Sequence, residues 1–180
     1  MNFTKVREHI IYEGPVFTLA DVTFVSPDGE NFRRQYVRHH GAVAVVPLTD
    51  DGKVILVSQY RGSIESDLLE IPAGLLDVEG ESLELAAARE LREETGMEAT
   101  HLEFLTTVVP APGLTDERVS IFVAHGLCEV GQDRKGPEEK YMTMVTIALA
   151  EALAMTYSGG IVDGKTIIGL HLVAGRSLGE

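Results

Sequence analysis

The spacing of apolar residues along the chain predicts short strands with a few helices among them. Strands are expected as two segments within 9–25, around Gly14-Pro15, and then at 32–39, 42–46, 54–60, 102–109, 119–127 and 141–148. Helices are expected at 82–95, 150–157 and 165–173. Because strands and helices do not alternate strictly, the pattern favours an α+β sandwich with a mixed sheet.

Turn residues separate some of these strands. Pro27-Asp28-Gly29 precedes the strand at 32–39, and Asp50-Asp51-Gly52 lies between the strands at 42–46 and 54–60. Asp-Gly pairs between apolar strands are typical of hairpins. We therefore expect two antiparallel hairpins at these places.

The segment 82–95 is the clearest helix. Ser82 can cap its first turn, helix-forming residues follow, and Gly96 supplies a stop. Residues four apart share one face of a helix. One apolar row is therefore expected to anchor this helix to a sheet: Leu83, Ala87 and Leu91.

Composition and charge limit the function. Of 180 residues, 44% are hydrophobic, which suits one folded domain, and the net charge of −13 disfavours nucleic acid and anionic membranes as partners. No apolar run approaches the roughly 20 residues of a membrane span, and the first residues do not resemble a secretory signal. The single cysteine, Cys128, excludes an internal disulfide and fits a cytoplasmic location. Its apolar surroundings predict a buried thiol.

Acidic residues concentrate between positions 65 and 94, where ten stand against two basic residues. Glu90, Glu93 and Glu94 are three and four positions apart, so they share a helical face. Two carboxylates about 5 Å apart repel by about 3 kcal/mol at an effective dielectric near 20, and a favourable helical pair with Arg89 returns only ~0.2–0.5 kcal/mol. Either water hydrates this face, or a divalent cation such as Mg²⁺ binds it.

The neighbouring residues resemble the Nudix box, the pattern G-x5-E-x7-R-E-U-x-E-E-x-G-U, in which U is aliphatic. The matching residues are Gly74, Glu81, Arg89, Glu90, Leu91, Glu93, Glu94, Gly96 and Met97. In this chain six residues, not five, separate Gly74 from Glu81, and the extra residue lies in the loop before the helix. The resemblance implies a Nudix-type α/β/α sandwich that hydrolyses a nucleoside diphosphate linked to another group.

The same resemblance implies roles for the box residues. Glu90 and Glu94 would bind Mg²⁺, for which Mn²⁺ can substitute, and Glu93 would be an additional ligand at the catalytic centre. Arg89 would hold Glu93, and Glu81 would support Arg89. A plain surface ion pair is the alternative for Arg89 and Glu81. Bound metal would neutralise the diphosphate and activate a water for in-line attack.

Beyond the box, the chain is similar to the ADP-ribose pyrophosphatases. Glu70-Ile71-Pro72-Ala73-Gly74 resembles their E-U-P-A-G run, which implies that the Ala73 carbonyl binds metal and that Glu70 lies beside the substrate. Arg61, which ends Gln59-Tyr60-Arg61, would reach a phosphate, although an exposed strand-end arginine is the alternative. Pro112 stands 15 residues after Met97, close to the proline spacing associated with ADP-ribose.

The loop at 136–139 implies a catalytic glutamate. In the subfamily a glutamate of this loop acts as general base or as a further metal ligand. Glu139 is preferred, because Met142-Thr143-Met144 follows it as in actinobacterial-type members. Glu138 and a merely solvated loop are the alternatives.

In this subfamily the N-terminal strands exchange between two subunits. By that resemblance, residues 1–40 would form a homodimer and residues 41–180 the Nudix domain. Phe17 is a candidate to stack on adenine, with core packing as the alternative. Arg34 is a candidate substrate contact from the partner subunit.

These observations predict a Mg²⁺-dependent hydrolase that cleaves ADP-ribose to AMP and ribose 5-phosphate. One alternative is a Nudix pyrophosphatase that acts on another nucleoside diphosphate sugar or nucleotide. A non-catalytic Nudix-like ligand sensor is the other, and it predicts eroded metal ligands, whereas Glu90, Glu93 and Glu94 are all present.

Overall fold

The structure, a computed structural model, describes residues 2–131 and 139–177, without the side chains of Glu139 and Ser177. The chain divides into two compact units. The smaller contains Met1–Gly41 with Val109–Arg118, and the larger contains Ala42–Val108 with Val119–Glu180. The segment Val109–Arg118 thus joins the N-terminal strands, which local sequence patterns did not indicate.

The smaller unit is an antiparallel sheet in the order β1-β2-β3, formed by β1 (Thr4–Glu13), β2 (Phe17–Val25) and β3 (Asn31–His39). Gly29, with φ 92°, lies in the turn between β2 and β3, so the first expected hairpin is confirmed. The segment 109–118 runs along β3, where the Val37 N–H donates to the Leu114 carbonyl at 2.9 Å.

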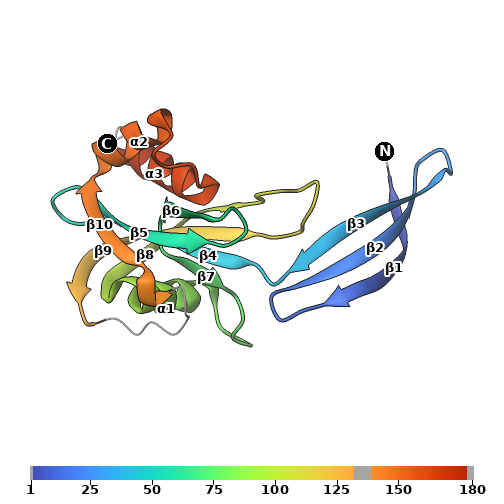
Figure 1. Ribbon diagram of the computed structural model, residues 1–180, viewed down its shortest axis with the longest axis horizontal. Coiled ribbons are helices and arrows are strands. Elements are labelled where there is room, and N and C mark those ends of the chain that lie inside the picture. Colours follow the sequence, from blue (N-terminus) through green and yellow to red (C-terminus); the bar gives the residue numbers. More distant parts are fainter. Residues whose placement is uncertain (1, 132–138, 178–180) are drawn as a thin grey trace. The chain divides into compact units, whose positions relative to one another are not determined.

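The larger unit places helices on both sides of two sheets. One sheet has the order β10-β5-β6, and the other, β7-β4-β9-β8, is mixed because only β4 and β9 are parallel. In Figure 1, α2 and α3 lie on one side of the strands and α1 on the other, which confirms the expected α/β/α sandwich. The strands are β4 (Ala42–Pro47), β5 (Lys53–Arg61), β6 (Ser66–Glu70), β7 (Ala73–Leu75), β8 (Met97–Val108), β9 (Val119–Glu129) and β10 (Thr143–Ala148). The helices are α1 (Leu83–Thr95), α2 (Leu149–Ser158) and α3 (Gly164–Ser177), with a 3₁₀ turn at Glu139–Tyr141.

The core has two layers because β4 is buried on both faces. Val43 and Val45 pack in one cluster with Leu91 of α1. Ala44 and Val46 belong to a second cluster on the opposite face, which includes residues of α2 and α3. A strand covered by helices on both sides explains the continuous apolar run at 42–46.

The second expected hairpin is wrong. Asp50-Asp51-Gly52 does form a turn, in which the Gly52 N–H donates to the Thr49 carbonyl at 3.0 Å, but β4 and β5 belong to different sheets. Next to the turn, an isolated bridge joins Leu48, the residue after β4, to Val54 of β5. An Asp-Gly turn predicts that the chain reverses, but it does not determine which strands pair when both are apolar on both faces. The short strands β6 and β7 were also not predicted.

Two burial predictions are wrong. Leu83 is 40% exposed at the first residue of α1, whereas the other two predicted anchors, Ala87 and Leu91, are buried together with Ala86. Cys128 is exposed, since burial along β9 ends before the strand does. Among the described residues, no helix is long and apolar enough to cross a bilayer.

Candidate active site

Helix α1 has the limits expected from the sequence. The Ser82 hydroxyl accepts from the Leu85 N–H at 3.2 Å, and Gly96 ends the helix with φ 72°, a left-handed conformation that costs glycine little. Because α1 packs on the sheet through its alanines and Leu91, the register places Glu90 and Glu94 at the edge of that contact, where both are buried.

The turn that begins β7 packs directly on these two glutamates. Glu94 is 5% exposed, and its Oε2 accepts from the Ala73 N–H at 3.1 Å. Glu90 is 8% exposed, and its carboxyl group occupies the place where a Cβ on residue 74 would lie. A side chain at residue 74 would therefore displace the Glu90 carboxyl group. The extra residue in the loop at 75–80 leaves this contact in place.

Arg89 connects the remaining carboxylates of the box. Its guanidinium forms a fork with Glu81, with Nε to Oε1 at 3.1 Å and Nη2 to Oε2 at 3.0 Å. Nη1 lies 2.5 Å from Oε1 of Glu90 and 3.4 Å from Oε2 of Glu93. The hydrogen bonds to Glu81, above all, raise the pKa of Arg89. The expected contacts of Arg89 with Glu81 and Glu93 are present, and the shortest contact is with Glu90.

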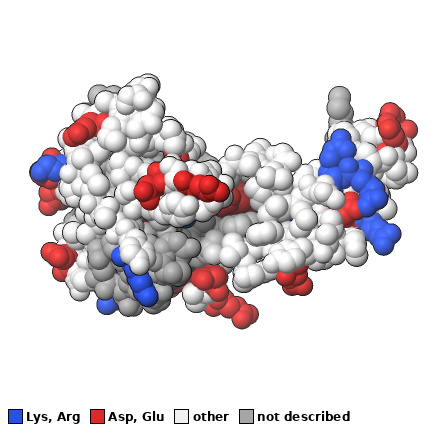
Figure 2. Space-filling view, in the orientation of Figure 1, with Lys and Arg blue, Asp and Glu red and all other residues white. Residues whose placement is uncertain are grey.

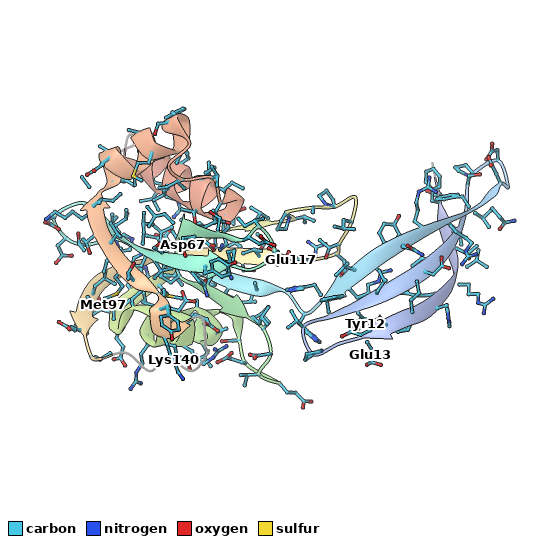
Figure 3. The ribbon with its side chains drawn as sticks, in the orientation of Figure 1. Tyr12, Glu13, Asp67, Met97, Glu117 and Lys140 are labelled. Atoms are coloured by element: carbon cyan, nitrogen blue, oxygen red, sulfur yellow. The ribbon has the colours of Figure 1, made fainter. Side chains whose placement is uncertain are left out.

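Arg61, the last residue of β5, and Glu70, the last residue of β6, form a second charged group on this antiparallel pair of strands. Two parallel hydrogen bonds of 2.7 Å join the guanidinium to the carboxylate, and Glu70 is only 1% exposed. Figure 3 labels Asp67 on β6, the strand that ends at Glu70. Glu70 therefore holds Arg61 from inside the unit. The pKa of Arg61 is raised, first by the Glu70 hydrogen bonds and further by the charges of Glu94 and Asp163.

Comparison with known proteins assigns this arrangement to a family. The NUDIX domain matches residues 38–159, which is most of the chain. The chain belongs to the Nudix family.

Known proteins resemble this chain over most of their length. The ADP-ribose pyrophosphatase of Mycobacterium tuberculosis is 40% identical over 172 residues, 96% of this chain and 83% of the relative. The methanol dehydrogenase activator of Bacillus methanolicus is 36% identical over 166 residues, 92% of this chain and 89% of the relative. A crystal structure of an ADP compounds hydrolase superposes with a TM-score of 0.84 at 29% identity, and the match covers 99% of this chain and 96% of the other chain.

The expected family and fold are confirmed, and the chain is a Nudix hydrolase.

The start of α3 adds residues to the group around Arg61 and Glu70 that the sequence analysis missed. Lys165 pairs with Oε2 of Glu70 and lies 3.1 Å from Oδ2 of Asp163. Burial raises the pKa of Glu70, but the hydrogen bonds from Arg61 and the charge of Lys165 outweigh this and lower it. The buried Thr166 hydroxyl accepts from the Ile71 N–H at 2.8 Å. The sequence did contain a signal for these residues. Asp163 is a typical residue to cap a helix, and Lys165 is unfavourable in a first turn because it opposes the helix dipole, so another role could be suspected for it.

Three expected substrate contacts lie in the smaller unit. Phe17 is 41% exposed, and its ring lies 5.8 Å from that of Tyr12. Arg34 is exposed, with its guanidinium 5.1 Å from the centre of the Phe32 ring, and Figure 2 shows other basic side chains gathered on this unit. Pro112 lines a hollow of about 350 Å³ together with Phe24 and Tyr36. Their contacts with substrate remain predictions.

Two of the expected catalytic glutamates, Glu138 and Glu139, precede β10 in the sequence. Glu138 lies outside the described residues, and so does the side chain of Glu139, whose backbone begins the 3₁₀ turn Glu139–Tyr141. The choice between them as general base remains a prediction.

Nudix hydrolases generally use divalent cations, and the oxygen donors of Glu90 and Glu94 fit such an ion. Within the described part of the chain, no three carboxylate, imidazole or thiolate groups are arranged as a finished metal centre. Glu90 and Glu94 nevertheless present hard oxygen donors next to the Ala73 and Gly74 backbone. Burial, only partly offset by Arg89, raises the pKa of Glu90. A cation would stabilise the charged form that burial disfavours.

Proposed function

We propose that the protein hydrolyses ADP-ribose to AMP and ribose 5-phosphate, with Mg²⁺ as its metal. The observation that carries this proposal is the pair of buried carboxylates, Glu90 and Glu94, held against the turn at Ala73 and Gly74. The 40% identical relative from Mycobacterium tuberculosis is named an ADP-ribose pyrophosphatase, and the superposed crystal structure is named an ADP compounds hydrolase. Both names support an adenosine diphosphate compound as substrate.

Each residue has a distinct part in this reaction. Glu90, Glu94 and the Ala73 carbonyl would hold the cation, and Glu93 would add a ligand. Bound divalent metal neutralises the diphosphate oxygens and acidifies a coordinated water. Arg61 binds one phosphate through the Nη1 edge of its guanidinium, because Nε and Nη2 are bound to Glu70. Glu139, or Glu138, removes a proton from the attacking water.

Mg²⁺ is the preferred metal because its ligands are hard oxygens and it keeps positions open for substrate phosphates. Mn²⁺ accepts similar ligands and is expected to substitute for it. Arg89 acts indirectly: its fork with Glu81 keeps the guanidinium against Glu90 and Glu93, so that these carboxylates stay on one side of α1.

A substrate panel tests the proposal. Purified protein is incubated with ADP-ribose, GDP-mannose, UDP-glucose and ATP, in Mg²⁺, in Mn²⁺ and with chelator, and products are separated by ion-exchange chromatography. ADP-ribose is expected to have the highest kcat/KM by at least about tenfold and to yield AMP only when metal is present. A higher kcat/KM for another nucleotide would favour a pyrophosphatase of different specificity. Binding without turnover of any compound would indicate a ligand sensor.

We also infer a homodimer formed through the N-terminal strands. Strand β1 exposes a set of large apolar side chains, which a lone soluble unit rarely leaves uncovered. Their exposed fractions are 61% for Val6, 45% for Ile10, 47% for Ile11 and 53% for Tyr12. Light scattering of the full chain is expected to give twice the mass of one chain, and Ile10→Glu is expected to lower it. A monomeric parent would refute the dimer.

We place this enzyme in the cytoplasm, where a nucleotide substrate and a chain with one cysteine are both expected. Cell fractionation followed by immunoblotting tests this location. Recovery of the protein outside the cytoplasmic fraction would contradict it.

A further inference from the structure

Four charged side chains meet at the start of α3, and the Nudix box uses none of them. We call Arg61, Glu70, Asp163 and Lys165 the Glu70 cluster. Glu70 Oε2 accepts from both Arg61 and Lys165, and the Lys165 ammonium also lies 3.1 Å from Asp163. The side chains of Glu70, Lys165 and Asp163 are 2%, 15% and 17% exposed, whereas that of Arg61 is 38% exposed. The cluster is therefore presented to solvent mainly through Arg61.

The balance of charge in the cluster depends on Lys165. With Lys165 there are two cations and two carboxylates, so the cluster is neutral. Without Lys165 the Arg61 guanidinium would share its surroundings with two carboxylates, and the net charge would be −1. A negative cluster repels an anionic diphosphate, and these groups are screened less than charges at an open surface because three of the four are largely buried.

The same turn of α3 holds the backbone that leads to the metal donors. The Asp163 carboxylate accepts from the Thr166 N–H at 2.9 Å and from its hydroxyl at 2.6 Å. The hydroxyl in turn accepts from the Ile71 N–H, one residue after Glu70 and two before Ala73. The position of Lys165 is thus set by the contact that also fixes the approach to β7.

We propose that Lys165 is a positioning residue for substrate binding. It binds Oε2 of Glu70 and compensates part of the negative charge beside Arg61, so that the Arg61 guanidinium can attract a substrate phosphate. This role rests on the proposed function. Lys165 does not contact the substrate and takes no part in the bond cleavage. Its effect is therefore expected on KM, with kcat nearly unchanged.

The test combines removal of the charge with its restoration. Lys165→Gln keeps an N–H donor for Glu70 but removes the positive charge, and is expected to raise KM for ADP-ribose about tenfold, equivalent to about 1.4 kcal/mol. The double variant Lys165→Gln/Asp163→Asn returns the cluster to neutrality and keeps a capping side chain at the start of α3. It is expected to bring KM back to within about threefold of the parent, as is Lys165→Arg.

Lys53→Gln is the matched control. It removes the same charge from an exposed pair with Asp51, at 2.6 Å, at the opposite end of β5 from Arg61. Eight residue steps of about 3.3 Å separate the two positions by roughly 26 Å. KM is therefore expected to stay at the parent value.

The outcomes separate the role of Lys165 from the activity itself. Hydrolysis of ADP-ribose by the parent, with a raised KM in Lys165→Gln and recovery in the double variant, would support the role. A parent-like KM in Lys165→Gln would overturn it and leave the proposed function intact. If Lys165→Gln has a lower melting temperature and the double variant does not restore KM, Lys165 has a purely structural role, and the proposal would also be overturned. A parent that hydrolyses no diphosphate would overturn both proposals.

Discussion

Gly74→Ala is the sharpest single test of the proposed metal site at Glu90 and Glu94. A methyl group at residue 74 would lie within the carboxyl group of Glu90, which is 8% exposed and held by Arg89 at 2.5 Å. Glu90 cannot simply rotate into solvent, because it is packed between β7 and the guanidinium. We expect the side chain to be displaced, and the turn at Ala73 and Gly74 to shift away from α1.

The structure sets the size of the effect. Adding a methyl group to a packed site costs about 1–3 kcal/mol. For a domain of this size, 1 kcal/mol lowers Tm by about 2–4 °C, so Gly74→Ala is expected to lower Tm by about 2–12 °C. Loss of one charge-stabilising group at a catalytic site typically costs about a hundredfold in kcat or more, and a similar loss is expected when Glu90 is displaced.

Two measurements and one control variant test the expected effect of Gly74→Ala. Calorimetry without metal gives the change in Tm, and the hydrolysis rate in saturating Mg²⁺ gives kcat. Gly175→Ala in α3 is the control, because a Cβ there meets nothing within 4 Å and alanine favours a helix by about 0.5–1 kcal/mol over glycine. A Gly74→Ala protein with the kcat and Tm of the parent would refute the contact between Gly74 and Glu90 and its place in the site.

Three further predictions follow from the same unit. Glu94→Gln is expected to lower kcat about a thousandfold while the fold survives, because the amide oxygen can still accept from the Ala73 N–H; a kcat within about tenfold of the parent would count against Glu94 as a ligand. Thr166→Val leaves the buried Ile71 N–H without its acceptor and is expected to lower the free energy of unfolding by about 1–3 kcal/mol in urea titration, whereas an unchanged value would mean that another acceptor replaces the hydroxyl. Because Arg61 and Lys165 lower the pKa of Glu70 in the folded state, the stability that this carboxylate contributes is complete above its ordinary pKa of 4.5 and is lost as the pH falls through the lowered folded value. The difference in unfolding free energy between the parent and Glu70→Gln is therefore expected to shrink below pH 4.5, and a difference that does not vary with pH would contradict this assignment.

Two buried carboxylates of this unit, Glu70 and Glu90, differ in how far their charge is compensated. Burial disfavours the charged form of Glu90, and only part of this effect is offset by Arg89. Glu70 is also buried, but two cations more than compensate. Glu90, one of the proposed metal ligands, is thus less well neutralised by the protein than Glu70 is. Incomplete compensation of charge, as at Glu90, is expected of a site that binds a cation. Full compensation, as at Glu70, is expected of an internal ion pair.

Local sequence determined the parts of this protein that depend on neighbours along the chain. The limits of α1 follow from Ser82 and Gly96, and the common face of Glu90, Glu93 and Glu94 follows from helical spacing. Backbone preference and a hydrogen bond within one turn suffice for both. The β2–β3 hairpin was predictable for the same reason.

Tertiary structure alone decided the contacts between segments that are distant in sequence. The strands β4 and β5 each contain a buried apolar run, at 43–46 and 54–57, yet they lie in different sheets, and burial along β9 ends before Cys128. Gly74 meets Glu90, and Lys165 meets Glu70, across 16 and 95 residues of chain respectively. No local propensity encodes such pairs, because their energy exists only once the sheets and helices have brought them together.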